Sequence, residues 1–314
     1  MLANKKIAVI GAGHMGRYHA GKFAGCEDAE LSVVVDSDSA RAEELAQDMG
    51  CAAVADYRQA IGYIDAAVIA TPTACHHEMA SACLRAGVHV LVEKPIARTV
   101  AEAEDLIALA DLGGLVLQVG HVERYNGAYR ALAARMAKPL FIDAERLSGF
   151  KQRGTDVDVV LDLMIHDIDL ALGLARSGVV AVSASGFRVL SSDIDIANAR
   201  IEFANGCVAN LSASRVSQSE VRKLRVFQPD LYVSADLQAG RLRYVSQSLG
   251  AIRETDEVHE AGDALAAQAR EFVAAASSLA PVEVTGEDGR DALALALRVG
   301  LLVNERLQKH AEAG

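Results

Sequence analysis

Several patterns that mark particular classes of protein are missing from this sequence. Only 25 glycines and 5 prolines occur among 314 residues, which excludes a collagen-like or largely disordered chain. The 5 cysteines are an odd number and form no C-x-x-C pair, so the sequence indicates neither a disulfide framework nor a zinc finger. We expect reduced thiols in a reducing compartment.

Long basic and long apolar runs are absent as well. The net charge is −11, with no run of Lys and Arg, which argues against nucleic-acid and anionic-membrane partners. The apolar run Ile7–Ile10 ends at Gly11 and is too short for a signal peptide, and Leu293–Val303 is interrupted by Arg298, so no stretch reaches the length of a membrane span. We therefore expect a soluble, cytoplasmic protein.

The first part of the chain alternates short apolar strands with helical segments, and the length suits two domains. Thr99 and Glu102 form a capping box before one such helix. Repeated strand–helix units predict a doubly wound parallel sheet over residues 1–122. The expected strands are Ile7–Ile10, Leu31–Val35, Ala52–Val54, Ala66–Ala70, Val88–Val92 and Leu115–Val119.

The pattern changes after about residue 122. A helix is predicted over Gly127–Met136 and another after Thr285, and Asn205-Gly206 is a hairpin signal between two strands. Strands that follow one another without helices predict an α+β domain with a mainly antiparallel sheet over residues 123–314. The expected strands are Leu140–Leu147, Val179–Leu190, Ala197–Phe203, Cys207–Ala213, Val221–Gln228 and Arg241–Ser246.

The segment Gly11-Ala12-Gly13-His14-Met15-Gly16 stands between a strand and a helix. Its glycines permit a tight turn, and the helix N-terminus offers free N–H groups to a pyrophosphate. The alternative is a glycine-rich turn without a ligand. Strand, helix and a later acidic residue together favour dinucleotide binding.

Asp36 follows the next strand and lies 20 residues after Gly16. A carboxylate there accepts hydrogen bonds from the ribose hydroxyls and repels a 2′-phosphate, which favours NAD over NADP. Asp36 also suits a helix cap, and both roles are compatible. Arg41 nearby leaves NADP as the less favoured cofactor.

Two further groups are candidates for proton transfer. Lys94 follows the fifth strand at the sheet edge where ligands bind, although most such lysines are surface residues. Asp162 and His166 are four residues apart and share one face of a predicted helix, where a carboxylate orients an imidazole. The alternative is a surface ion pair. His76 and His77 have no further ligands at metal spacing, so we predict no metal.

Taken together, these motifs resemble the glucose–fructose oxidoreductase/inositol dehydrogenase/rhizopine catabolism (Gfo/Idh/MocA) family. The resemblance rests on the glycine loop, Ala70–Thr73, Glu93-Lys94-Pro95 and the Asp162/His166 pair. It implies oxidation of a sugar or cyclitol hydroxyl by a pyridine nucleotide, without metal, and an open-faced C-terminal sheet that forms a homo-oligomer interface. It also implies catalytic roles for Lys94, Asp162 and His166. The implied cofactor-binding residues are Gly11, Gly13, His14, Met15, Gly16, Asp36, Thr71, Pro72, Thr73, His76, Glu93 and Lys94.

A narrower resemblance is carried by Gly120–Asn126 and Arg153–Asp169, which are similar to bacterial UDP-N-acetylglucosamine 3-dehydrogenases, although Thr155–Val160 departs from the glycine-rich segment of many family members. This implies oxidation at C3 for the synthesis of a 3-amino sugar of the lipid A type. A diphosphate needs positive charge, which a loop over Arg146–Gly154 offers unless it is simply an exposed basic surface. The candidate substrate-binding residues are His121, Arg124, Tyr125, Asn126, Arg146, Lys151 and Arg153.

Three other functions stay open at this stage. One is another sugar or cyclitol dehydrogenase, such as an inositol 2-dehydrogenase. A second is an NAD-dependent glycosidase, and a third is a non-catalytic nucleotide sensor. The set of Lys94, Asp162 and His166 argues against the sensor, which has no need of proton-transfer groups.

Overall fold

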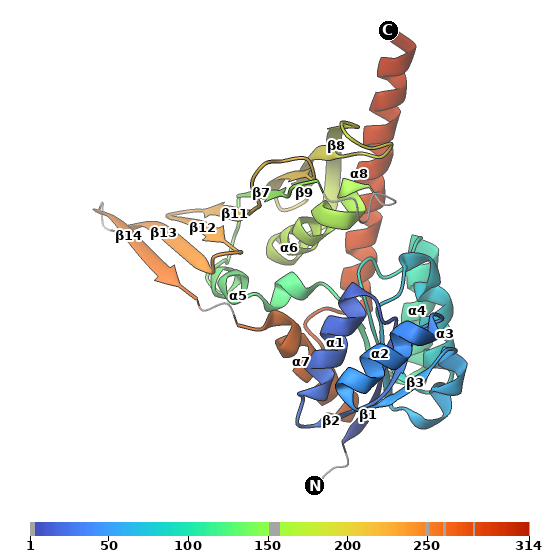
Figure 1. The fold of residues 1–314 in the computed structure, drawn as a ribbon. Helices are drawn as coiled ribbons and strands as arrows, with labels where there is room; N and C mark the ends of the chain where they lie inside the picture. Colours follow the sequence, from blue (N-terminus) through green and yellow to red (C-terminus); the bar gives the residue numbers. More distant parts are fainter. Residues whose placement is uncertain (1–3, 151–157, 249–250, 260–261, 279, 314) are drawn as a thin grey trace. The chain divides into compact units, whose positions relative to one another are not determined.

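The computed structural model describes residues 4–150, 158–248, 251–259, 262–278 and 280–313 (Figure 1). The chain forms two compact units, one of Met1–Val122 with Asp263–Asp291 and the other of Glu123–Gly262 with Ala292–Gly314. The predicted fold class is confirmed by a parallel sheet in the first unit and a mainly antiparallel sheet in the second. No helix among the described residues is long and apolar enough to cross a membrane.

The first unit holds a six-stranded sheet with the order β3-β2-β1-β4-β5-β6. All its neighbouring strands are parallel, and the chain order reverses between β1 and β4. Ligands bind at such a reversal, beyond the carboxyl ends of the strands. The strands are β1 (Lys5–Ile10), β2 (Ala29–Val35), β3 (Ala52–Val54), β4 (Ala66–Ile69), β5 (His89–Val92) and β6 (Leu117–Val119).

Helices of the first unit pack on this sheet, with α1 in contact with α2 and α3 in contact with α4. Thr99 caps α4 by accepting a hydrogen bond from the Glu102 N–H, as the capping box predicts. The helices are α1 (His14–Ala24), α2 (Ser39–Met49), η1 (Tyr57–Gln59), η2 (Ile61–Tyr63), η3 (Thr73–Cys75), α3 (His76–Arg85), α4 (Val100–Gly113) and α7 (Ala264–Ser278).

Residues 263–291 pack with the first unit, whereas the sequence analysis assigned them to the second domain. The reason is apolar packing: Phe272 of α7 is fully buried and its ring meets that of Phe23 edge-on, with centroids 6.3 Å apart. Lys22 pairs with Asp263 at 2.7 Å. These contacts join segments that the sequence alone gave no reason to bring together.

The second unit holds an eight-stranded sheet with the order β14-β13-β12-β11-β7-β10-β9-β8. Its neighbours are antiparallel except β7 and β10, which are parallel. The sequence analysis did not predict β12 or β14. The strands are β7 (Phe141–Leu147), β8 (Val179–Phe187), β9 (Ile196–Phe203), β10 (Val208–Ser214), β11 (Val221–Gln228), β12 (Leu231–Asp236), β13 (Arg241–Ser248) and β14 (Ala251–Val258).

One face of this sheet carries the core of the second unit. Buried and exposed residues alternate strictly along β9, and Ile142, Ala144 and Leu211 are fully buried on the inner face. The remaining elements are η4 (Val122–Tyr125), α5 (Gly127–Ala133), the π-helix η5 (Val160–Met164), α6 (Ile165–Ala175) and α8 (Gly286–Ala313). Helix α8 begins in the first unit and continues into the second.

Candidate active site

The glycine loop joins β1 to α1 through close backbone contacts. Gly11 has φ of +102°, and a Cβ there would lie 2.6 Å from the Ala70 oxygen. A Cβ on Gly16 would lie 1.7 Å from the Gly11 oxygen, whereas Gly13 faces open space. No side chain caps α1, and its first turn has no acidic residue. The loop therefore leaves the positive end of the helix open to an anion.

A cavity of about 540 Å³ lies beside this loop at the carboxyl ends of β1, β2 and β4. It brings together six of the predicted cofactor-binding residues, from three separate segments of the chain. They are Gly11, Gly13, Met15, Asp36, Thr71 and Pro72. Of the others, exposed His14 packs its ring against Tyr18, Gly16 lies within α1, and Thr73 begins η3.

Asp36 directly follows β2, and its carboxylate joins the glycine loop to the segment after β2. Its Oδ2 accepts a hydrogen bond of 2.8 Å from the Ala12 N–H, and its Oδ1 accepts one of 2.9 Å from the Asp38 N–H. Each carboxylate oxygen keeps a second lone pair, which a ribose hydroxyl can use. Arg41 also lines the cavity, and its Nε pairs with the Asp38 carboxylate at 3.1 Å.

Thr71 also lines the cavity, and buried His76 contacts the backbone of its loop. The Thr71 hydroxyl is buried at the cavity and has no hydrogen-bond partner among the described residues, which fits a site that takes a polar ligand. The ring of buried His76 lies between two carbonyl oxygens, those of Thr71 and Pro95, at 2.9 Å each. Burial lowers the pKa of His76, and this effect outweighs the two hydrogen bonds, which act to raise it. His76 thus positions the loop of Thr71.

Glu93 and half-buried Lys94 follow β5 in the first unit, and the Lys94–Pro95 peptide bond is cis. The Glu93 carboxylate is buried and contacts the Nε2 atom of buried His19 at 2.7 Å. The sequence analysis missed His19. The available signal was its place on the apolar face of α1, three residues after Gly16.

Asp162 and His166 lie in the second unit and are both half-buried. The predicted regular helix is wrong at Asp162, which lies in the π-helix η5, while His166 lies in the first turn of α6. Asp158 explains the start of this segment, since its Oδ1 accepts hydrogen bonds of 2.9 Å from the N–H groups of Val160 and Leu161. Short π-helices often occur at functional sites.

Arg124 and Arg146 are buried in ion pairs of the second unit. Arg146 lies within β7, not in the predicted basic loop, and donates to Asp167 and Glu123 at 2.9–3.1 Å. Burial opposes the charge of Arg146, but the two carboxylates raise its pKa. Arg124 donates two bonds of 2.8 Å to Asp169. Carboxylates accept hydrogen bonds from both guanidinium groups, which gives both arginines a structural role in this unit, and their contact with a substrate diphosphate stays a prediction.

Three other candidate substrate residues, His121, Tyr125 and Asn126, are buried in the protein or make contacts within it. Asn126 caps α5, accepting from the N–H groups of Ala128 and Tyr129. Tyr125 is buried under the Arg130 guanidinium, and His121 is fully buried after β6. The remaining two, Lys151 and Arg153, lie outside the described residues.

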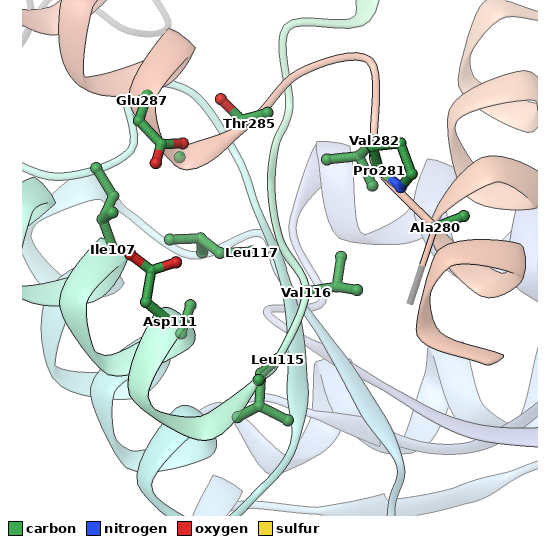
Figure 2. Close-up of a pocket in the computed structure, with 13 residues that line it drawn as sticks. Ile107, Asp111, Leu115, Val116, Leu117, Ala280, Pro281, Val282, Thr285 and Glu287 are labelled. Carbon is green, nitrogen blue, oxygen red and sulfur yellow. The ribbon is translucent and has the colours of Figure 1, made fainter. Parts of the chain in front are cut away.

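A second cavity, of about 360 Å³, lies beside the edge strand β6, between the end of α4 and residues 280–287 (Figure 2). Its lining includes apolar Ile107 and Leu117 and the carboxylates of Asp111 and Glu287. Negative charge disfavours phosphate groups, and no predicted site residue lies there. The cavity beside the glycine loop is therefore the dinucleotide candidate. Among the described residues, no group of three or more His, Cys, Asp and Glu side chains could hold a metal ion.

Comparisons with known proteins agree with this geometry. Residues 5–121 match the model of the oxidoreductase family with an NAD-binding Rossmann fold, and residues 101–228 match that of the GFO/IDH/MocA C-terminal domain. UDP-N-acetylglucosamine 3-dehydrogenase of Acidithiobacillus ferrooxidans is 38% identical over 98% of this chain and 100% of its own. The chain belongs to the Gfo/Idh/MocA oxidoreductase family.

Structures within this family are similar over nearly the whole chain. The A. ferrooxidans enzyme has a TM-score of 0.91 and 38% identity, covering 96% of this chain and 98% of its own. A scyllo-inositol dehydrogenase from Lactobacillus casei, solved with bound NAD(H) and scyllo-inositol, has a TM-score of 0.83 and 19% identity, covering 96% and 98%. The second similarity concerns the fold alone. The chain is thus an oxidoreductase with an NAD-binding Rossmann fold.

Proposed function

We propose that this protein oxidises the C3 hydroxyl of UDP-N-acetylglucosamine to a ketone with NAD. The product would supply a 3-amino sugar of the lipid A type. The observation that supports this substrate is the 38% identity to a UDP-N-acetylglucosamine 3-dehydrogenase that extends over nearly all of both chains. Inositol dehydrogenases are more distant, at 29% identity over 68% of this chain for that of Bacillus subtilis.

Asp36 supports NAD over NADP. Its carboxylate lines the cavity and is held at two oxygens by backbone N–H groups, so a 2′-phosphate would meet negative charge. Arg41, which could offset that charge, already pairs with Asp38. We assign cofactor binding to residues 1–122 and substrate binding to the domain that begins at residue 123.

The proposed chemistry needs three side chains of this protein. A bound NAD would supply the hydride acceptor for the sugar carbon, and the residues beside the glycine loop would hold it. His166 takes the proton of the sugar hydroxyl, and Asp162 orients its imidazole. Lys94 donates a hydrogen bond to the same oxygen and stabilises its developing negative charge. Since carboxylates occupy Arg124 and Arg146, Lys151 and Arg153 are the basic residues that we assign to the diphosphate.

The proposal also includes a cytoplasmic homo-oligomer formed through the outer face of the second sheet. That face carries exposed Phe227, with its ring 4.7 Å from that of Tyr232 and 5.9 Å from that of Phe141. Phe141 and Tyr232 are half-buried beside it, and aromatic residues that reach the surface are enriched at protein interfaces.

The experiment is to follow NADH absorbance when purified protein is mixed with NAD and, separately, with UDP-N-acetylglucosamine, N-acetylglucosamine or myo-inositol. An amino donor and its transaminase are included because they consume the keto-sugar product and so shift an unfavourable oxidation equilibrium toward NADH. We expect a signal with the UDP-sugar only.

A signal with inositol alone would keep the family chemistry and overturn the substrate. Silence with all three compounds, in protein that binds NADH by fluorescence, would overturn the proposal and favour an unrelated substrate or a nucleotide sensor.

A further inference from the structure

The Glu93 carboxylate is enclosed on two sides within the first unit. On one side, the Nε2 atom of His19 lies 2.7 Å from its Oε1. On the other, a Cβ on Gly120 would lie 3.1 Å from the Glu93 Cα, Cδ and Oε1 atoms, so a larger residue there would press on this side chain. The side chain of Glu93 is 10% exposed and has little space to rotate.

This carboxylate is held in its ionised form. Burial alone would raise the pKa of Glu93, but the hydrogen bond from His19 and the positive charge of Lys94 lower it below its usual range. An ionised carboxylate only accepts hydrogen bonds, so the Nε2 atom of His19 is the donor. The contact is short, as expected for a bond to a charged acceptor.

The side chain of His19 makes no other hydrogen bond among the described residues. Its side chain is 1% exposed, and its Nδ1 atom is buried without a partner there. On α1 it shares a buried face with Gly16, Ala20 and Phe23, which are otherwise small or apolar. A histidine in this stripe costs desolvation that an apolar residue would not, and its polar contact is directed at Glu93.

Glu93 in turn acts on Lys94. Its Oε2 accepts a hydrogen bond of 3.3 Å from the Lys94 N–H, and the Lys94 charge is close enough to lower the pKa of Glu93. The two opposite charges therefore lie close together, and a fixed Glu93 carboxylate attracts the Lys94 side chain beside it.

We propose that His19 is a positioning residue of the dehydrogenase, which holds the Glu93 carboxylate so that Lys94 stays charged and fixed toward the substrate oxygen. The inference rests on the proposed role of Lys94. It assigns Lys94 to stabilising the oxygen as an ammonium group and leaves proton acceptance to His166. It also links the glycine loop to Lys94, because α1 begins at that loop and carries His19.

The test compares His19→Leu, which removes the donor at similar volume, with His19→Gln, which keeps an N–H donor. We expect His19→Leu to lower kcat about tenfold, less than the roughly 10²–10⁴ of direct proton transfer because His19 acts through Glu93, with KM and NADH affinity nearly unchanged. The alkaline limb of the kcat profile should move to lower pH, and His19→Gln should restore much of both effects. His77→Leu, which breaks another imidazole–carboxylate pair, with Asp105 at 2.8 Å, is the matched control.

A second readout needs no substrate. Reductive methylation of Lys94, followed by mass spectrometry across pH, gives the midpoint at which its amine becomes reactive. Without the His19 donor, Glu93 is less ionised and less fixed, so this midpoint should move to lower pH. Glu93→Gln, which keeps the side-chain size, should move it in the same direction and replaces His19→Leu if that variant does not fold.

The outcomes separate this inference from the proposed function. A shifted Lys94 midpoint in protein that is silent with UDP-N-acetylglucosamine would support the positioning role while the substrate assignment fails. Unchanged midpoint and unchanged kcat profile in folded His19→Leu would overturn the positioning role, whatever the substrate. Equal losses in His19→Leu and His77→Leu would also overturn it, because they would indicate a general effect of removing a histidine pair.

Discussion

The carboxylate of Asp36 makes cofactor choice a property of one residue. We expect Asp36→Ser to lower kcat/KM for NAD by at least about tenfold, since hydrogen bonds to a charged group contribute about 1.5–3 kcal/mol. Removal of its charge should also improve the use of NADP. The measurement is kcat/KM for both cofactors. Asp48→Ser on α2, which removes an exposed carboxylate paired with Arg17, should leave the ratio unchanged. A ratio unchanged in Asp36→Ser as well would contradict the assignment.

Lys94 gives the most direct test of catalysis. Lys94→Met keeps the length of the side chain and removes its charge, so we expect a loss of about 10²–10⁴ in kcat. NADH binding, measured by the fluorescence of the bound cofactor, should remain nearly intact. Full activity in this variant would exclude Lys94 from the mechanism.

At this scale, the sequence predicted residues whose role depends on local backbone. Gly11, Asp36 and Thr71 follow strands of a parallel sheet, and strand order places them in one cavity. The buried ion pairs of Arg146 were not predictable, because Asp167 and Glu123 lie more than 20 residues away in the sequence. His19 was missed for the same reason, since its partner lies 74 residues further along the chain.

At the scale of elements, the start of η5 depends on Asp158. Asp158→Ala removes the acceptor of two N–H groups and should cost about 1 kcal/mol of unfolding free energy, as for other helix caps. We also expect a lower kcat, because Asp162 lies within the segment that begins there. Asp158→Asn keeps an acceptor and is the control in urea unfolding and steady-state assays. Equal stability and activity in Asp158→Ala and the native protein would contradict this role.

His76 joins the Thr71 loop to the segment after Lys94 and predicts a pH dependence of stability. Its pKa is lowered in the folded protein by burial, while the unfolded chain takes up a proton near the ordinary value of 6.5. This contribution is therefore present above about pH 6.5 and is lost as the pH falls through the folded pKa.

His76→Gln removes that proton uptake. The stability difference between native protein and variant, from urea unfolding at about pH 7.5 and about pH 5.5, should narrow at the lower pH. A difference that does not change with pH would contradict the assignment to His76.

Which elements were predictable follows from their burial. Buried strands such as β4, and β5 after its first residue, are continuous apolar runs, and β11 alternates in burial from Leu224 to Phe227. Strand β14 was missed because seven of its eight residues are exposed, which leaves no alternation to detect. Helix α7 is rich in alanine, a residue that lies equally well on either face and weakens the helical period.

For the whole molecule, the outer face of the second sheet predicts association. Phe227 alternates with buried Val226 along β11 and is 39% exposed. We expect light scattering to give a mass above the 33.1 kDa of one chain, and Phe227→Glu to lower it, because a charge would be buried in the interface. Leu112→Glu, at a residue of α4 that is 87% exposed, is the control. A single-chain mass for the native protein would contradict the interface.

The division of the chain at Val122, Gly262 and Asp291 restricts how genes of this family can recombine. A single exchange at residue 122 would combine the parallel sheet of one parent with α7 of another. Phe23 of the first parent would then pack against whichever residue the second parent has in place of Phe272. A functional chimera needs residues 1–122 and 263–291 from the same parent, with one junction inside α8. If the second unit binds the substrate as proposed, we expect new specificity to arise more readily by exchanging the segment between residues 123 and 262 than by joining two gene halves.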